Sequence, residues 1–440
     1  MAHVPELDEP REPGSIWARS ADPSLHWRPL VGDASAGTVV VGGGFTGLSA
    51  ALHLAERGEA VVVLDAAEPG WGASGRNGGQ VIPGLKADPQ ALEACYGPEW
   101  GARVVRTVGG AAENLFELVA RYQIDCHARQ AGWIQPAHCA GAMVAVRGRA
   151  QQWRQRGVDA RLLDGDEVRG LLGCAPSVYV GGWLDPRGGS IQPLALARGL
   201  ARVAADMGVA VHGHARATQL RRAAGLWEVA TPAGRVRAQR LVLATNGYTD
   251  GLWPGLARSI VPVYSQQIAT APLAPALRER ILPHGQVASD TRRLMRYYRL
   301  DAAGRLLMGG RGPFRERPGM ADTAVLYREA CRLFPGIEGV ALETTWAGRV
   351  AMTADHLPHL HVLADNAYAA LGYNGRGVAM AVTMGRLLAD LVTGASVHTL
   401  DYPTTPPRPL PLHALRRPAI AALTAWYRLL DYRDERRVRA

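Results

Sequence analysis

The stretch VVVGGGFTGLSAALHLAERG, residues 39–58, decides the fold because it passes from a β-branched run to a glycine-rich turn and then to a helical pattern. Gly42, Gly44 and Gly47 have the spacing G-x-G-x-x-G directly after the apolar run. Apolar residues then recur at helical spacing, and a second β run, AVVVLD, ends in Asp65. The pattern therefore predicts a complete unit of strand, helix and strand.

Each of these residues has a separate task in a nucleotide-binding unit of this kind. Gly42 permits the tight turn, Gly44 lets the backbone approach a pyrophosphate, and Gly47 lets the helix pack closely on the strand. The pyrophosphate would lie at the helix N-terminus, where free amides and the helix dipole favour negative charge. Asp65 would accept a hydrogen bond from a ribose hydroxyl.

Bulk composition excludes several classes of protein. With 440 residues, 48% apolar and 20% charged, the chain is long enough for two globular domains. The net charge of +10 comes from scattered arginines, so we expect no nucleic-acid partner. The five cysteines show no paired spacing, which predicts neither a disulfide framework nor a zinc site. No run is long enough for a membrane span, and the acidic N-terminus is unlike a secretory signal, so we expect a cytoplasmic protein.

Three further stretches decide between FAD and a nicotinamide dinucleotide. GWGASGRNGGQ (70–80) is too rich in glycine for a strand or helix, and its backbone would let a ligand come close. ATNGY (244–248) follows a strand, where open α/β sheets bind ligands. GYNGRGVAMA (372–381) is a second glycine-rich turn that opens a helix. A nicotinamide dinucleotide does not require this second turn, whereas a helix N-terminus there would stabilise negative charge on a flavin. The sequence therefore predicts FAD.

Together with GGGFTGLSAALHLAERG, these stretches resemble the D-amino-acid-oxidase-like (DAO) superfamily of FAD-dependent oxidoreductases, and most closely its γ-glutamylputrescine oxidoreductase group. The resemblance spans nearly the whole chain. It implies an α/β fold with a Rossmann-type FAD-binding domain and a second, antiparallel-sheet α+β substrate domain. We expect the first domain at 32–87, 190–260 and 344–402, the second at 88–189 and 261–343, and a C-terminal helical extension at 403–440.

The resemblance also implies which residues bind the cofactor and the substrate. The FAD-binding residues would be Gly42, Gly44, Gly47, Asp65, Ser74, Arg76, Asn77, Gly78, Gly79, Ala217, Ala244, Thr245, Gly247, Gly375, Arg376, Gly377 and Val378. Relatives often have glutamate where this chain has Asp65. The substrate would contact Tyr264, Gln267, Tyr297, Trp346, Arg349 and Tyr373. No cysteine or histidine lies where covalent attachment could be argued, so we expect non-covalent FAD.

The implied activity is oxidation of an amine by hydride transfer to flavin N5, followed by hydrolysis of the imine. The substrate would be a polyamine-derived or γ-glutamylated amine, and Arg349 could bind the carboxylate of a γ-glutamyl end. The electron acceptor would be oxygen or another molecule. Alternatives are a D-amino-acid or imino-acid dehydrogenase, an RNA-modifying flavoprotein, and a flavin-binding subunit of an assembly.

Two further patterns bear on the chemistry. His356, His359 and His361 lie close together, but their spacing fits neither one helix face nor one strand face, so we predict no metal site; His356 could face the pocket instead. Relatives resembling sarcosine oxidase place a lysine over the flavin on a strand that RLLMGGR matches, where this chain has Met308. The sequence leaves open whether the enzyme is an oxidase or a dehydrogenase.

Overall fold

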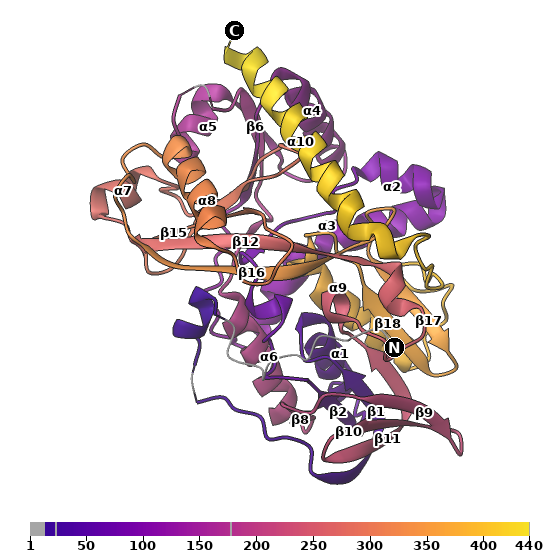
Figure 1. Ribbon diagram of the computed structural model, residues 1–440. Coiled ribbons are helices and arrows are strands. Elements are labelled where there is room, and N and C mark those ends of the chain that lie inside the picture. The colour runs from indigo at the N-terminus through magenta and orange to yellow at the C-terminus, as the bar shows by residue number, and fades with distance from the viewer. Residues whose placement is uncertain (1–13, 23, 177, 440) are drawn as a thin grey trace.

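The structure is a computed structural model that describes residues 14–22, 24–176 and 178–439. Two large sheets are stacked along the molecule, with a two-stranded sheet as the third. Figure 1 shows β1, β2 and β11 at one end, and β12, β15 and β16 crossing the middle of the molecule. This is the predicted combination of a Rossmann-type sheet with a second, mainly antiparallel sheet.

Parallel strands form the centre of the first sheet, in the spatial order β8 (Ala210–His212), β2 (Val61–Leu64), β1 (Gly32–Val41), β11 (Gly234–Leu243) and β18 (Ala367–Leu371). Antiparallel strands complete it, namely β17 (His359–Ala364) beside β18, and the hairpin β9 (Gln219–Ala223) and β10 (Leu226–Thr231) beside the first half of β11. The sheet thus carries β1 at its centre, as the predicted strand, helix and strand unit requires.

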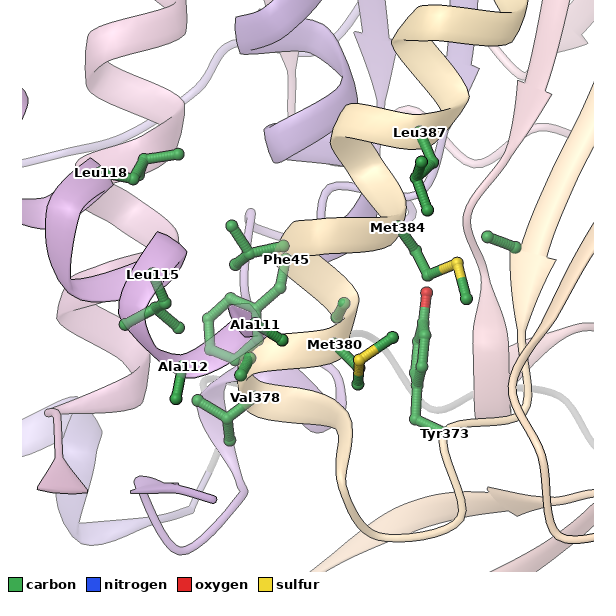
Figure 2. Close-up of a cluster of buried hydrophobic side chains, with 14 of the residues drawn as sticks. Phe45, Ala111, Ala112, Leu115, Leu118, Tyr373, Val378, Met380, Met384 and Leu387 are labelled. Atoms are coloured by element: carbon green, nitrogen blue, oxygen red, sulfur yellow. The ribbon is translucent and has the colours of Figure 1, made fainter. Parts of the chain in front are cut away.

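Helices bury one face of this sheet, and they are α1 (Phe45–Ala55), α3 (Pro98–Arg121), α6 (Pro193–Asp206) and α9 (Gly377–Val392). Figure 2 shows Phe45 of α1 and Val378 of α9 pointing toward Ala111 and Leu115 of α3. The α1 and α9 helices approach so closely that a Cβ atom at Gly385 would lie 2.5 Å from the Cβ atom of Ser49. This contact fixes the second glycine-rich turn relative to the first.

The second sheet has the spatial order β16 (Leu342–Met352), β12 (Val261–Pro272), β15 (Arg305–Arg311), β14 (Tyr297–Leu300), β13 (Val287–Ser289), β4 (Trp133–Ala137), β6 (Gly181–Asp185) and β5 (Arg161–Asp164). Its neighbours are antiparallel except for the parallel pair β13 and β4. The other helices are α2 (Pro89–Tyr96), α4 (Ala140–Arg154), α5 (Gly165–Leu172), α7 (Pro275–Arg280) and α8 (Met320–Leu333). The short strands β3 (Gln80–Val81) and β7 (Gly189–Ser190) pair with each other.

The domain boundary predicted at residue 344 places most of strand β16 in the FAD-binding domain, and the structure places it in the other sheet. It pairs with β12 from Met352 to Leu342, so it belongs to the antiparallel sheet rather than to the FAD-binding sheet. The chain returns to the parallel sheet only at β17. The sheet to which a strand belongs is set by its long-range partner, here β12, and this partner leaves no local signal in the sequence.

The C-terminal helix α10 (Arg416–Arg439) crosses the front of the molecule in Figure 1. Both oxygens of the buried Asp431 accept backbone hydrogen bonds, from Arg293 at 3.1 Å and from Leu294 at 3.0 Å. Glu435 of the same helix forms an ion pair with Arg292 at 2.9 Å. The helix therefore braces the loop between β13 and β14. Within the described residues, no helix combines the length and the apolar content that a membrane crossing needs.

We predict that Asp431→Ala loosens this loop, because two backbone amides lose their acceptor and a buried network is broken. The free energy of unfolding should fall by about 1–3 kcal/mol. Hydrogen exchange of the amides in residues 290–296 should rise markedly. The control is Asp365→Ala, since this carboxylate is 88% exposed and its loss should change neither measurement. Equal exchange in both variants would show that α10 does not brace the loop.

Candidate active site

A cavity of about 880 Å³ lies between the two large sheets. All four stretches that the sequence singled out contribute to its lining, and β12, β14 and β16 of the antiparallel sheet contribute to it from the other side. Its volume is in the range of small-molecule and cofactor sites, and such sites are frequent between domains.

The first turn is built on the absence of side chains. Gly42 has φ +109°, and a Cβ atom there would lie 2.8 Å from the carbonyl oxygen of Ala244. At Gly44 a Cβ atom would lie 3.0 Å from Oγ of Ser74, which accepts a hydrogen bond from the amide of Phe45 at 2.9 Å. The N-terminus of α1 consequently faces the cavity with bare backbone around it.

Asp65, at the end of β2, lines the same part of the cavity. Its carboxylate accepts hydrogen bonds from the amide of Gly43 at 2.6 Å and from that of Ala67 at 2.9 Å, one on each oxygen. Each oxygen keeps a second lone pair, so a ribose hydroxyl could still donate to it. Burial raises the pKa of Asp65 to about 6, while the two amide hydrogen bonds act in the opposite direction.

The stretch 70–80 runs along the cavity as an irregular segment, interrupted by the short 3₁₀ helix η2 (Ala73–Gly75). The side chain of Asn77 holds the turn, since its amide nitrogen donates to the carbonyl of Ser74 and its oxygen accepts from the amide of Gly79. The carbonyl oxygen of Arg76 accepts from Nε2 of Gln267 at 2.6 Å. The antiparallel sheet thereby fixes a loop that has little regular structure of its own.

The second glycine-rich turn ends at the N-terminus of α9, as predicted. Asn374, Gly375, Gly377 and Val378 line the cavity there. The hydroxyl of Tyr373 lies 2.6 Å from that of Thr46 in α1, and Figure 2 shows its ring beside α9. The two helix N-termini are therefore tied together at the cavity.

Most of the predicted cofactor residues line the cavity, namely Gly42, Gly44, Asp65, Ser74, Arg76, Asn77, Gly78, Ala217, Ala244, Thr245, Gly375, Gly377 and Val378. Three glycines do not line it, and each has a packing role. A Cβ atom at Gly47 would lie 1.9 Å from the carbonyl oxygen of Gly42, one at Gly79 would lie 2.2 Å from that of Ile191, and one at Gly247 would lie 3.3 Å from Cβ of Arg349. These glycines allow segments to meet rather than a ligand to bind.

Arg376 also lies outside the cavity lining, contrary to the expectation that it reaches the flavin. Its guanidinium lies 4.7 Å from the centre of the Trp133 ring and donates to the carbonyl of Pro83. Burial lowers the pKa of Arg376 to about 9. The side chain leaves the turn on the side away from the cavity, and a sequence pattern does not show this direction.

Of the predicted substrate residues, Gln267, Tyr297, Arg349 and Tyr373 line the cavity, and Tyr264 and Trp346 do not. Trp346 packs edge-on against Trp17 and donates to the carbonyl of Arg76, so it supports the loop from behind. Tyr264 lies next to the Arg349 guanidinium, 5.9 Å from ring centre to Cζ. His356, which the sequence suggested could face the pocket, is exposed and does not line it.

Neither Met308 nor any other residue of strand β15 is among the residues that line the cavity. Met308 is buried in the core on the far face of the antiparallel sheet, and its neighbour Gly309 faces the cavity side beside Tyr297. A Cβ atom at Gly309 would lie 2.1 Å from Cζ of Tyr297, so the tyrosine ring occupies the space that a side chain on β15 would fill. A register shift of one residue exchanges the two faces of a strand.

Further residues line the cavity without having been predicted, and Trp71, Gln80, Tyr248, Ser265, Met295 and Arg416 are among them. Trp71, Gln80 and Tyr248 lie within the glycine-rich stretches 70–80 and 244–248, so their place in these motifs was a signal for them. Arg416 comes from the C-terminal extension and Met295 from the loop that α10 braces. Nothing local in the sequence connects either one to the cavity.

The tyrosines around the cavity remain neutral hydrogen-bonding groups. Burial raises the pKa of Tyr248, Tyr297 and Tyr373 above its ordinary value. The hydroxyl of Tyr297 lies 2.8 Å from that of Ser265 on β12. These neutral hydroxyl groups could form hydrogen bonds with a ligand without adding charge to the cavity.

The residues present fit a flavin dinucleotide. Bare glycine backbone at the N-termini of α1 and α9 lies on one elongated cavity, together with an acid at the end of β2. The DAO family, described as FAD dependent oxidoreductase, matches residues 38–391. This chain belongs to that family.

Similar proteins agree with membership of the DAO family. The chain is 33% identical to γ-glutamylputrescine oxidoreductase of Escherichia coli K12 over 420 residues, which cover 95% of this chain and 98% of that protein. Glycine oxidase from Geobacillus kaustophilus has a TM-score of 0.71 at 22% identity, over 82% of this chain and 96% of that one. Iminodiacetate oxidase from Chelativorans has a TM-score of 0.69 at 20% identity, over 84% and 100%. The last two likenesses concern the fold of this DAO-family chain.

Two of the three neighbouring histidines lie on β17 and contact the chain beside it. The rings of His359 and His361 are stacked with centres 5.5 Å apart, and Nδ1 of each lies close to an oxygen of Thr405. Among the described residues, another group, His138, Cys139 and Asp434, brings three donor atoms within 4.8 Å of one another. Arg293 already donates to Asp434 at 2.7 Å, so a cation there would have to displace a guanidinium.

We predict that Gly47→Ala yields protein that purifies without flavin, because the new methyl group would collide with the carbonyl of Gly42 and push α1 away from the turn. Absorbance near the flavin bands and the temperature of unfolding both measure this. Gly148→Ala is the matched control, since Gly148 also lies in a helix and a Cβ atom there meets nothing within 4 Å. A yellow Gly47→Ala protein with unchanged stability would contradict the role.

We also predict that FAD affinity falls as the pH is lowered through about 6, because that is the folded-state pKa of Asp65. Above this pH the carboxylate is ionised and accepts strongly from a ribose hydroxyl, and below it the proton removes the charge. Titration of apoprotein with FAD at pH 5 and pH 7 measures the difference. Asp65→Asn should bind FAD weakly at both pH values. If the FAD affinity of Asp65→Asn fell between pH 7 and pH 5 by as much as that of the wild type, the pH dependence would belong to another group.

Proposed function

We propose that this DAO-family chain oxidises a primary amine that carries an amino-acid end, as γ-glutamylputrescine does. The similarity to γ-glutamylputrescine oxidoreductase supports this substrate class. The observation that carries it is a pair of arginines at the cavity wall, Arg76 and Arg349, which share the carboxylate of Glu316.

The two arginines offer positive charge to a ligand, and Glu316 lies outside the cavity lining. Nη1 of Arg76 lies 2.6 Å from Oε1 of Glu316, and Nη2 of Arg349 lies 3.4 Å from Oε2 of the same carboxylate. One carboxylate between two guanidiniums leaves a net positive charge, and both arginines line the cavity. Nε of Arg349 is buried and makes no hydrogen bond. An α-carboxylate would bind the two arginines.

The neighbours of Arg349 keep its guanidinium protonated and fix its orientation. Burial alone would lower its pKa, but Tyr264, Tyr248 and Glu316 outweigh this effect, so the pKa lies above its usual value. The guanidinium also lies 4.7 Å from the centre of the Tyr248 ring. An aromatic face on one side and a carboxylate on the other hold it in a fixed orientation toward the cavity.

Bound FAD supplies the hydride acceptor for the carbon that bears the amine. The chain's own residues must hold that amine without its proton, so that the nitrogen lone pair can assist loss of the hydride. The carboxylates that line the cavity, Asp65 and Asp250, lie on the parallel-sheet side, and Asp250 pairs with Arg216. Tyr297, Gln267 and Ser265 instead present neutral groups from the antiparallel sheet. The resulting imine is hydrolysed by water to an aldehyde and ammonia.

We further propose that FAD is bound non-covalently, since none of the described residues that line the cavity is a cysteine or a histidine. A cytoplasmic location and a small-molecule electron acceptor, oxygen or another, complete the proposal. Its first test is the visible spectrum before and after anaerobic addition of γ-glutamylputrescine. Bleaching of the flavin supports the proposal, and bleaching by D-amino acids alone would replace it with a D-amino-acid dehydrogenase.

We predict that Arg349→Met raises KM for γ-glutamylputrescine by a factor of about ten to one hundred, because a charge-assisted hydrogen bond to the carboxylate is lost. KM for putrescine, which lacks the amino-acid end, should change little. Steady-state kinetics with both amines measure the ratio. Arg222→Met on the exposed strand β9 is the control and should leave both values unchanged. Equal effects on both amines would remove Arg349 from recognition of the amino-acid end.

A further inference from the structure

The antiparallel sheet places a buried polar atom without a partner at the cavity. Gln267, in the middle of β12, is 1% exposed and lines the cavity, yet its Oε1 makes no hydrogen bond. A buried acceptor that stays unpaired costs about 1–3 kcal/mol. Such an atom in a ligand cavity indicates that a ligand supplies the missing donor.

The orientation of this amide is fixed. Nε2 of Gln267 donates to the carbonyl of Arg76 at 2.6 Å, and a flipped amide would place two acceptor oxygens against each other. The same carbonyl also accepts from Nε1 of Trp346 at 2.9 Å, so the loop keeps a second support. The group presented to the ligand is therefore an oxygen, which accepts hydrogen bonds and cannot donate them.

The oxygen lies beside the glycine-rich loop 70–80 and the ring of Tyr297. A Cβ atom at Gly78 would lie 3.3 Å from Oε1 of Gln267 and 2.9 Å from the ring of Tyr297. Gln267, Gly309 and Tyr297 also form one row across the antiparallel sheet. The missing side chains at Gly78 and Gly309 thus leave room for the oxygen and the tyrosine ring to lie side by side.

We propose that Oε1 of Gln267 accepts a hydrogen bond from the N–H of the substrate's reacting amine and so selects against fully N-alkylated amines. This inference rests on the proposed amine oxidation. A neutral amide oxygen stabilises an ammonium ion less than a carboxylate would, and its hydrogen bond leaves the lone pair of a neutral amine free. Gln267 is accordingly a specificity-determining residue, and it transfers no proton.

The test measures binding separately from turnover. The probe is a γ-glutamylputrescine analogue with two methyl groups on the carbon that bears the free amine, because that carbon has no hydride to give. It is titrated into the FAD-loaded full-length protein and followed by the flavin spectrum. Its N,N-dimethyl derivative, which has no N–H when neutral, is titrated in parallel.

Gln267→Met should weaken binding of the probe about tenfold, as expected for an unmade hydrogen bond, and leave the N,N-dimethyl derivative unchanged. Gln267→Asn, which keeps the amide but shortens it, should also weaken the probe. Gln286→Met is the matched control, because Gln286 has a buried, unpaired Oε1 outside the cavity and should change neither titration. If Gln267→Met weakened binding of the probe and of its N,N-dimethyl derivative equally, Gln267 would have a merely structural role and the proposal would be overturned.

Two other outcomes would also overturn it. Gln80 carries the second unpaired amide oxygen on this cavity, with Nε2 bonded to the carbonyls of Ala288 and Tyr298. If Gln80→Met weakened the probe and Gln267→Met did not, Gln80 would hold the amine. If Gln267→Met shifted the flavin spectrum or midpoint potential without any amine, the oxygen would serve the cofactor. If the wild-type protein bound the probe but no amine reduced its flavin, the proposed function would be rejected, and the Gln267 contact would be one to a bound amine that does not react.

Discussion

The contact between the Gly42 turn and the carbonyl of Ala244 is the constraint on which the cavity depends. A Cβ atom at Gly42 would stand 2.8 Å from that oxygen, so only glycine lets the ends of β1 and β11 meet. This meeting exposes the N-terminus of α1 at the edge of the sheet. The close packing of α1 on α9 at Gly385 then brings the second glycine-rich turn to the same edge. Two helix N-termini from distant parts of the chain thus share one cavity because side chains are missing at a few positions.

The irregular stretch 70–80 gains its rigidity from outside. The carbonyl of Arg76 accepts from Gln267 and Trp346, and the carbonyl of Gly78 accepts from Nε of Arg299. Trp17, in the 3₁₀ helix η1 (Ile16–Arg19), donates to the carbonyl of Asn77. The stretch is held by β12, β14, β16 and a segment that precedes the first strand, so its backbone hydrogen bonds are satisfied without regular secondary structure.

Sequence patterns predicted those features that depend on local geometry. The turn at Gly42, the start of α9 at Gly377 and the acid at the end of β2 follow from spacing and terminal signals. The direction of Arg376 and the placement of Met308 did not follow, because each depends on which side of an element faces the cavity. The assignment of β16 to the antiparallel sheet and the arrival of Arg416 from α10 depend on partners far away in the chain. A resemblance between sequences predicts which residue types occur at the site, whereas the packing of the chain decides which of them face the cavity.

The cavity separates charged recognition from neutral recognition. On the proposed function, the amino-acid end of the substrate does not react, so Arg76 and Arg349 can bind its carboxylate through ion pairs without affecting the reaction. The reacting nitrogen is different, because a carboxylate beside it would hold the ammonium form and withhold the lone pair that hydride transfer needs. An amide oxygen and tyrosine hydroxyls whose pKa is raised by burial bind a nitrogen without favouring its charge. The same logic explains why a residue such as Gln267 would be chosen over glutamate: the two side chains have nearly the same shape, and only the neutral one leaves the amine ready to react.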